Sequence, residues 1–168
     1  MSDREDIVEL INLYGLAMDT RRWDLFDRIF AADVDADYGA TSRWTDRDSF
    51  KHDFGSFHEL FDATQHVMTN HLVSVNGDGA VSNTYGAWRL IRHAAGEPPV
   101  WDGTGYYDDT WRRDRHGWRI ARRVCRVVYW SGNSRVQAPD EGLAFQLDLV
   151  SPWHEARSER LALLNAIS

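Results

Sequence analysis

The first part of the chain has the hydrophobic spacing of an amphipathic helix. Ser2 and Glu5 match a capping box, in which each side chain accepts a hydrogen bond from the other residue's backbone N–H at a helix start. The apolar positions that follow recur on one helical stripe, and they are Ile7, Leu10, Ile11, Tyr14 and Met18. We therefore predict a first helix that ends at about Asp19.

Two shorter helices and one strand are expected in the next forty or so residues. The aromatic positions within residues 23–30 are spaced as in a short helix, and residues 34–38 alternate between apolar and acidic side chains as in a strand. Thr45 and Asp48 are expected to cap a third helix. The apolar side of that helix carries Phe50, Phe54, Phe57 and Phe61.

From Thr64 onward the hydrophobic period changes to two. Residues 64–75 and 80–92 predict a hairpin across the turn Asn76-Gly77-Asp78-Gly79, and residues 100–113 and 118–130 predict a second one. Helices followed by a long antiparallel meander indicate an α+β domain, with the N-terminal helices packed on one face of a curved antiparallel sheet.

The pattern weakens after Trp130. We expect a loop over residues 131–140, a short strand over 145–150 and a last helix that begins at Ser151-Pro152. The sequence contains no internal repeat and no second-domain boundary. We therefore expect one domain, in which residues 1–133 form the body and residues 134–168 a C-terminal extension.

Composition and charge narrow the class of protein. A domain of 168 residues buries roughly 70% of its unfolded surface, and a single cysteine excludes an intrachain disulfide. The N-terminus is charged where a signal peptide is apolar, and the apolar runs are far shorter than the roughly 20 residues of a membrane span. The net charge of −7 disfavours nucleic acid. We expect a cytoplasmic protein with neither membrane nor nucleic acid as partner.

The main candidate for chemistry is a pair of residues, Asp19 and His66. His66 lies on a predicted strand whose other side chains suit an enclosed, mostly apolar cavity. At 100° per residue, Asp19 falls at the edge of the buried helical stripe, where a carboxylate can reach a cavity without entering the core. A carboxylate held against an imidazole is the simplest way to make that imidazole a base. We therefore expect Asp19 and His66 to meet.

The other polar candidates have competing structural interpretations. Asn70 shares a face with His66 and either contacts substrate or satisfies backbone at a bulge, the second being favoured. On the last strand Arg119 and Arg123 face one way and Arg122 and Arg126 the other. Cross-strand pairing with Asp102, Asp108 or Asp109 explains most of these arginines, and Arg123 is retained as a site residue.

Aromatic residues are abundant, with eight Trp, six Tyr and seven Phe, and some of them are expected to line a pocket. The candidate wall residues are Tyr38, Trp44, Phe54, Trp88, Tyr106 and Tyr129. His71 is offset from His66 by an odd number of strand positions, so the two imidazoles cannot share one metal. Without a His-Glu-x-x-His motif or a cysteine cluster, we expect no metal site.

The order of these elements resembles the nuclear-transport-factor-2-like cone fold, and in particular its SnoaL-like branch. That branch includes scytalone dehydratase, bile-acid 7α-dehydratase and hexachlorocyclohexane dehydrochlorinase. The resemblance covers roughly residues 3–133. The resemblance is based on the segments 14–19, 23–26, 30–34, 64–66 with Asn70, 77–80 and 117–120.

The resemblance implies a cone-shaped α+β barrel and a cofactor-free elimination. The aspartate and histidine of the dehydratases and the dehydrochlorinase fall on Asp19 and His66, so His66 would remove a proton from carbon while Asp19 fixes its tautomer. The tyrosine of the bile-acid enzyme falls on Tyr14, which would hydrogen-bond the substrate carbonyl or the departing oxygen. We expect a dehydratase-like lyase that acts on a small hydrophobic cyclic substrate.

Two departures limit what the resemblance transfers. A further aspartate of the bile-acid enzyme falls near Trp88, so that enzyme's steroid substrate and its leaving-group assistance do not carry over. The arginine of the dehydrochlorinase falls near Arg123, but its lysine falls on Tyr14, which argues against dehalogenation. The alternatives are a polyketide cyclase or ketosteroid-isomerase-like enzyme and a non-catalytic protein that binds a hydrophobic ligand.

A homo-oligomer is also expected. The sheet face opposite the helices is predicted to carry exposed apolar and aromatic residues that need cover. These residues are Val81, Tyr85, Tyr107 and Tyr129. The dehydratase relatives imply a trimer, and other members of the fold imply a dimer.

Overall fold

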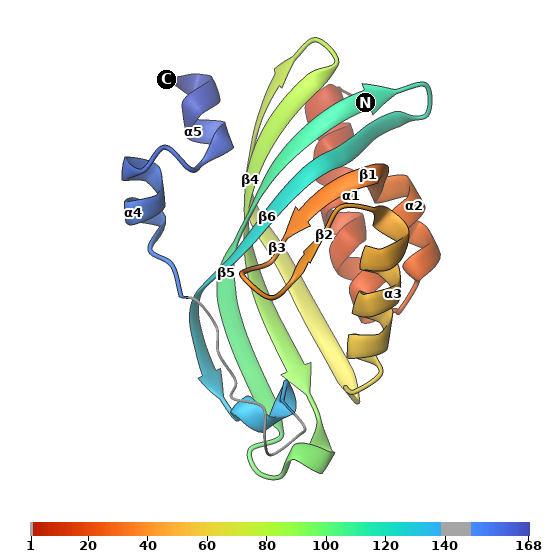
Figure 1. The fold of residues 1–168 in the computed structure, drawn as a ribbon, viewed down its shortest axis with the longest axis vertical. Coiled ribbons are helices and arrows are strands. Elements are labelled where there is room, and N and C mark those ends of the chain that lie inside the picture. The colour runs from red at the N-terminus through yellow and green to blue at the C-terminus, as the bar shows by residue number, and fades with distance from the viewer. Residues whose placement is uncertain (1, 139–148) are drawn as a thin grey trace.

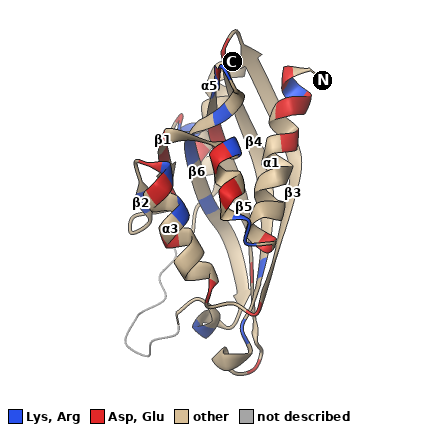
Figure 2. Ribbon diagram, turned by 90° about the vertical axis from the view of Figure 1, so that its right-hand side faces the viewer, with Lys and Arg blue, Asp and Glu red and all other residues tan. Residues whose placement is uncertain are grey.

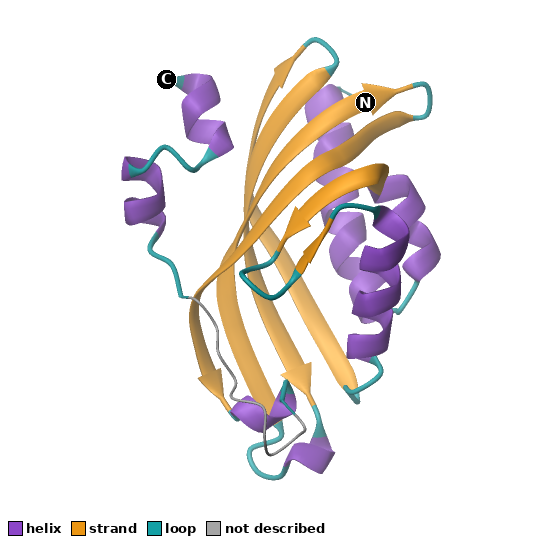
Figure 3. Cartoon of the chain, viewed as in Figure 1, coloured by secondary structure: helices purple, strands orange, loops and turns teal. Residues whose placement is uncertain are grey.

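The structure is a computed structural model that describes residues 2–138 and 149–168. Two helical layers lie on opposite sides of one strongly curved sheet (Figures 1 and 3). The N-terminal layer contains α1 (Asp3–Asp19), η1 (Trp23–Leu25), α2 (Phe26–Ile29) and α3 (Arg47–His58). The strands are β1 (Phe30–Asp37), β2 (Arg43–Trp44), β3 (Ala63–Asn76), β4 (Gly79–Ile91), β5 (Val100–Asp114) and β6 (Gly117–Gly132). Two single turns of 3₁₀ helix, η2 (His93–Ala95) and η3 (Ser134–Val136), lie beyond the ends of β4 and β6.

The sheet has the strand order β2-β1-β6-β5-β4-β3. The two predicted hairpins, β3–β4 and β5–β6, are present and pair antiparallel. β1 pairs parallel with β6, so the sheet is mixed and not purely antiparallel as the sequence suggested. This pairing joins strands far apart in the chain, because β1 leaves the helical layer and is added beside the last strand. β2 and β3 are the two terminal strands, and the sheet is not closed.

The core lies between the concave face of the sheet and the N-terminal helices. Ile7, Ile11 and Met18 of α1 are buried there, as the predicted stripe requires. Trp111 and Ile120 are contributed by the sheet. Charged residues are frequent along the N-terminal helices, and acidic and basic positions are interspersed there (Figure 2).

The starts of α1 and α3 are both capped by side chains, although the cap of α3 differs from the expectation. The predicted capping box of α1 is present: the Ser2 N–H donates to the Glu5 carboxylate at 2.7 Å, and the Glu5 N–H donates to the Ser2 hydroxyl at 3.4 Å. The cap of α3 is Asp46 rather than Thr45. Its carboxylate accepts the Ser49 N–H at 2.8 Å, because the helix begins one residue later than the pattern suggested.

The C-terminal segment contains two short helices where one was expected. α4 (Pro152–Arg157) and α5 (Ala162–Ile167) are separated by a turn in which Glu159 has a φ of 55°. α5 packs on the convex face of the sheet, where the Asp108 carboxylate accepts the Ala162 N–H at 2.7 Å. Of the strand expected over residues 145–150, Leu149 forms a single bridge with Val127, and residues 145–148 lie outside the described part.

None of the helices within the described ranges combines the length and the apolar character that crossing a membrane requires.

Candidate active site

The structure brings Asp19 and His66 into direct contact. Asp19 is the last residue of α1, and His66 lies near the start of β3. The Nδ1 atom of His66 lies 2.7 Å from Asp19 Oδ1, and the backbone N–H of His66 donates to Asp19 Oδ2 at 2.8 Å. The Thr64 hydroxyl donates to Asp19 Oδ1, also at 2.8 Å. The His66 side chain is 6% exposed and that of Asp19 24%, so the pair is sheltered from bulk solvent.

These hydrogen bonds determine the protonation of the pair. Burial raises the pKa of the Asp19 carboxyl, but the side-chain and backbone hydrogen bonds from His66 and the one from Thr64 outweigh it, and the pKa lies below its usual value. An ionised carboxylate can only accept hydrogen bonds, so Nδ1 of His66 carries the proton. In the neutral form of this imidazole the lone pair is on Nε2, for which the described residues provide no hydrogen-bond partner.

A close approach of α1 to β3 makes the contact between Asp19 and His66 geometrically feasible. Gly15 faces the strand, and a Cβ atom at this position would lie 3.2 Å from Met68 Cγ and 3.4 Å from the His66 carbonyl oxygen. A Cβ this close would require the Met68 side chain to give way by a few tenths of an ångström. The absence of a side chain at Gly15 therefore fits the close packing of this helix on the strand that carries His66.

Three tyrosine hydroxyls lie together inside the concave face. Tyr14 and Tyr38 share a hydrogen bond of 3.0 Å, and the Tyr107 hydroxyl accepts the Trp88 indole N–H at 2.7 Å. The Tyr14 ring lies 6.5 Å from the His66 ring between centroids. Burial raises the pKa of Tyr14 to about 12, so its hydroxyl stays protonated and is available as a donor.

Arg123 lies beneath these tyrosines as a fully buried cation. Its guanidinium donates to both carboxylate oxygens of Asp109, at 2.8 and 2.7 Å, and both side chains are 0% exposed. The guanidinium carbon also lies 4.3 Å from the centre of the Tyr14 ring and 4.4 Å from that of Tyr107. Nη1 is buried and has no hydrogen-bond partner among the described residues. Arg123, which the sequence analysis set apart as a site residue, thus forms a cross-strand pair of the kind expected for the other arginines, and its Nη1 group has no partner among the described residues.

His58 is a second imidazole near the site, and the sequence analysis missed it. Its Nδ1 lies 2.7 Å from the Phe54 carbonyl oxygen, and its ring centroid lies 6.2 Å from that of His66. Burial lowers the pKa of His58 to about 4, so the side chain is neutral at neutral pH. The only sequence signal was its position after Phe54 on the apolar side of the third helix.

The predicted wall residues divide between two faces. Trp88 stands opposite His66 on the neighbouring strand, and Tyr38, Trp44 and Phe54 form one aromatic cluster with ring centroids 5.0–6.0 Å apart. Tyr106 and Tyr129 lie on the convex face instead, which is wrong for Tyr106 as a wall residue and agrees with the second expectation for Tyr129, that of an exposed residue on the sheet face opposite the helices. There, Tyr129 is 60% exposed and Tyr106 is paired across the strands with Tyr85, which is 50% exposed.

Two further orientations differ from the expectation. Tyr107 faces the concave side and not the convex one, because strand alternation places it opposite to Tyr106. Asn70 does not share the environment of His66. A register shift between Thr69 and Leu72 turns its backbone to a φ of 53°, and its side chain is exposed, which fits the bulge interpretation.

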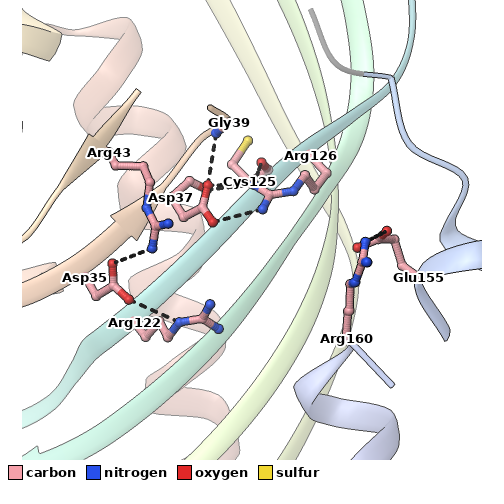
Figure 4. Close-up of polar contacts among 9 residues, drawn as sticks. All are labelled: Asp35, Asp37, Gly39, Arg43, Arg122, Cys125, Arg126, Glu155 and Arg160. Carbon is pink, nitrogen blue, oxygen red and sulfur yellow. Dashed lines mark hydrogen bonds and ion pairs between the residues drawn. The ribbon is translucent and has the colours of Figure 1, made fainter. Parts of the chain in front are cut away.

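The surface of the described structure has clefts of ligand size, and two of them are well formed. The larger, of about 430 Å³, lies between the β1–β2 turn, β6 and the C-terminal segment, and Tyr38 is part of its lining. Figure 4 shows its charged lining residues, among them Asp37, Arg126 and Arg160. The second, of about 310 Å³, lies beside the N-terminus of α1 and the β5–β6 turn. Neither is lined by Asp19 or His66. Over residues 2–138 and 149–168, no group of three or more His, Cys, Asp or Glu side chains is arranged to hold a metal ion.

Comparison with known proteins identifies similar sequences over most of the chain. The profile of the SnoaL-like domain matches residues 1–124. Rv2910c, an uncharacterized protein of Mycobacterium tuberculosis, is 33% identical over 125 residues, which make up 74% of this chain and 84% of that protein.

Solved structures show the same architecture. A protein from Novosphingobium aromaticivorans, provisionally named a scytalone dehydratase, has a TM-score of 0.68 at 20% identity and covers 74% of this chain and 83% of its own. A nuclear transport factor 2-like superfamily protein from Salmonella enterica has a TM-score of 0.66 at 18% identity. The match covers 78% of this chain and 91% of that protein. These likenesses confirm the expected fold.

Proposed function

The chain belongs to the SnoaL-like domain family, and from this premise we propose that it is a cofactor-independent lyase or isomerase. In this proposal His66 removes a proton from a carbon next to a carbonyl group, and Asp19 orients the imidazole and stabilises the imidazolium that forms. The substrate is a small hydrophobic cyclic molecule, and dehydration is the reaction that we favour.

One observation supports this proposal above the others. The Asp19 carboxylate accepts both the Nδ1 proton and the backbone N–H of the same histidine, at 2.7 and 2.8 Å. This fixes the orientation of the ring and leaves the basic lone pair on Nε2 without a protein partner among the described residues. This arrangement suits a general base, which needs one ring nitrogen held in place and the other free to take a proton.

Tyr14 and Arg123 are the proposed partners for developing negative charge. Proton removal next to a carbonyl puts charge on the carbonyl oxygen, and hydrogen-bond donors that are already in place stabilise it. Tyr14 keeps its proton because burial raises its pKa to about 12, and Arg123 has an unused N–H at Nη1. Trp88, which faces the same interior, is proposed as wall and not as an acid.

A non-catalytic ligand-binding protein is the second candidate. It is supported by the position of the two clefts described above, neither of which is lined by Asp19 or His66. The close contact between Asp19 and His66 favours the enzyme, because a binding protein has no need for an oriented base. A polyketide cyclase or a ketosteroid-isomerase-like enzyme would use the same first step, proton abstraction. Measuring proton exchange would therefore detect these enzymes as well.

The proposal can be tested without knowledge of the natural substrate. Exchange of α-protons for deuterium in D₂O reports proton abstraction directly, and ¹H NMR follows it on a panel of cyclic ketones and β-hydroxy ketones. We expect enzyme-dependent exchange with at least one member. His66→Gln should slow it by about 10²-fold or more, and Asp19→Asn should also slow it strongly.

Thr20→Ala provides the matched control, since Thr20 follows Asp19 but its hydroxyl donates to the Leu16 carbonyl and not to the pair. Its exchange rate should equal that of the wild type. Wild-type rates in folded His66→Gln and Asp19→Asn proteins would contradict the assignment. Absence of exchange across the panel, with tight binding of a panel member, would favour the ligand-binding alternative.

A further inference from the structure

The cleft of about 430 Å³ plays no part in the proposed reaction. It is built by three segments that are distant in the chain: the β1–β2 turn, the middle of β6 and the C-terminal segment around α4. Its volume falls within the range of small-molecule sites, roughly 300–1,000 Å³. Tyr38, Cys125 and Val127 provide an uncharged surface within it. A site of this size with an apolar part suits a small organic molecule.

The charged residues of the cleft are mainly arginines. Arg43, Arg126 and Arg160 line it together with two carboxylates, Asp37 and Glu155. The described lining therefore has an excess of one positive charge, in a chain whose formal net charge is −7. A locally basic cleft on an acidic protein attracts anions that the rest of the surface repels.

The Nη1 and Nη2 groups of Arg126 donate hydrogen bonds to other groups of the protein. Its Nη1 and Nη2 atoms donate to the two carboxylate oxygens of Asp37 at 3.0 and 2.9 Å, and Nη1 also reaches the Asp37 and Cys125 carbonyl oxygens (Figure 4). This pair is largely buried, with side chains 20% and 11% exposed. Its function is to neutralise Asp37 and fix one wall of the cleft.

Arg43 and Arg160 keep N–H groups free among the described residues. Arg160 uses only Nη1, at 3.0 Å from Glu155, and Arg43 makes one contact of 3.6 Å with Asp35, which is too long for a hydrogen bond (Figure 4). The planar fork of a guanidinium matches the two oxygens of a carboxylate. These two side chains are therefore the available anion binders of the cleft.

We propose that this cleft is a second ligand site, which binds a small aromatic carboxylate. The carboxylate lies on the free N–H groups of Arg160, and the ring covers Tyr38, Cys125 and Val127. Arg43 adds positive charge from the opposite, β1–β2 side of the cleft (Figure 4). A monoanion fits better than a phosphate dianion, because the lining offers one net positive charge and the whole chain is acidic.

The test uses 2-naphthoate as the probe, with 2-naphthalenemethanol as its uncharged counterpart, and isothermal titration calorimetry as the measurement. We expect the carboxylate to bind at least about tenfold more tightly than the alcohol. Arg160→Gln should weaken it by about tenfold, because a hydrogen-bonded charge is lost, and Arg43→Gln should weaken it by less, because only charge at the opposite side is lost. The matched control is Arg122→Gln: Arg122 also contacts Asp35, at 3.2 Å, but does not line the cleft. It should bind as the wild type does.

A His66→Gln protein separates this proposal from the proposed reaction. Naphthoate binding should persist in it, because His66 does not line the cleft. The proposal is overturned if the carboxylate and the alcohol bind equally. It is also overturned if neither cleft variant weakens binding, or if His66→Gln abolishes binding while the arginine variants retain it. Proton exchange by the wild type is unaffected by any of these outcomes.

Discussion

At the scale of single residues, burial decides the charge of His58. Burial is the largest cause that lowers its pKa, to about 4 from an ordinary 6.5, and its hydrogen bond to the Phe54 carbonyl opposes this only in part. Between these values the unfolded chain binds a proton on this imidazole and the folded chain does not. Folding stability is therefore expected to fall as the pH decreases from about 6.5 to 4.

The size of this effect is measurable. We expect His58 to contribute on the order of 3 kcal/mol to the loss of unfolding free energy across that window. His58→Phe should flatten the pH dependence by this amount, with urea denaturation at pH 7, 6, 5 and 4.5 as the measurement. His93→Phe is the control, because His93 is exposed and pairs with Asp62 at the surface. Equal slopes for wild type and His58→Phe would refute the assignment.

The buried pair of Arg123 and Asp109 makes a second residue-scale prediction. Asp109→Asn removes the carboxylate but leaves a cation that is 0% exposed, so we expect a loss of about 3–5 kcal/mol in unfolding free energy. Asp109→Leu combined with Arg123→Met should lose much less, because no charge remains buried. A double-mutant cycle by chemical denaturation measures both. A single variant of near wild-type stability would contradict the expected cost of an unpaired buried charge.

The sequence was informative at this scale only where a residue had a distinctive partner. The contact between Asp19 and His66 followed from a carboxylate at the end of a stripe and an imidazole on a strand. His58 was missed because its hydrogen-bond partner is a backbone carbonyl, which no pattern of side chains reveals. Tyr106 and Tyr107 were assigned to the wrong faces because both are aromatic, so alternation alone does not say which one points inward.

At the scale of elements, the helical and strand periods located most segments to within a few residues. The predictions were wrong about how one strand pairs and about where the last helix is interrupted. The parallel pairing of β1 with β6 depends on tertiary packing, and local periodicity carries no information about it. The last helix was predicted as continuous because Trp153, Leu161 and Leu164 are apolar, but the chain turns at Glu159 between α4 and α5.

Docking of α5 on the sheet is expected to depend on Asp108. This carboxylate is 2% exposed and accepts the Ala162 N–H, and the neighbouring Leu163 is 3% exposed. Asp108→Ala should increase hydrogen–deuterium exchange of the Ala162 and Leu163 amides by about tenfold, since one hydrogen bond to a charged acceptor is lost. Asp102→Ala, which removes the surface partner of Arg89, should leave these amides unchanged. Unaltered exchange in Asp108→Ala would show that Leu163 packing alone holds the helix.

At the scale of the whole molecule, α5 leaves part of the convex face uncovered. Val67 of β3, Tyr85 of β4 and Tyr129 of β6 are 45%, 50% and 60% exposed. Residues paired across strands form an uncharged row there, in which Val67 faces Ala87, Ala87 faces Thr104 and Thr104 faces Tyr129. An exposed row of this kind is typical of a surface that associates.

We therefore retain the prediction of a homo-oligomer built on this row. Light scattering after size exclusion should give a mass that is a multiple of 19.4 kDa. Val67→Lys and Tyr129→Lys should shift it toward the single chain, because a buried unpaired lysine opposes association. Leu16→Lys is the control, since Leu16 is 57% exposed on the opposite, helical side. A wild-type mass of one chain at about 100 µM would refute the prediction.

The hydrogen bond from the His66 N–H to Asp19 has a consequence beyond catalysis. β3 is a terminal strand, so its outward N–H groups are a template on which another polypeptide could add a strand. The Asp19 carboxylate accepts the N–H of residue 66, and the Arg4 guanidinium donates to the carbonyl oxygen of residue 71 at 3.3 Å. Neither backbone group is therefore available to pair with another strand. Loss of Asp19 would thus leave the border of the sheet open to aggregation as well as leaving the base unsupported.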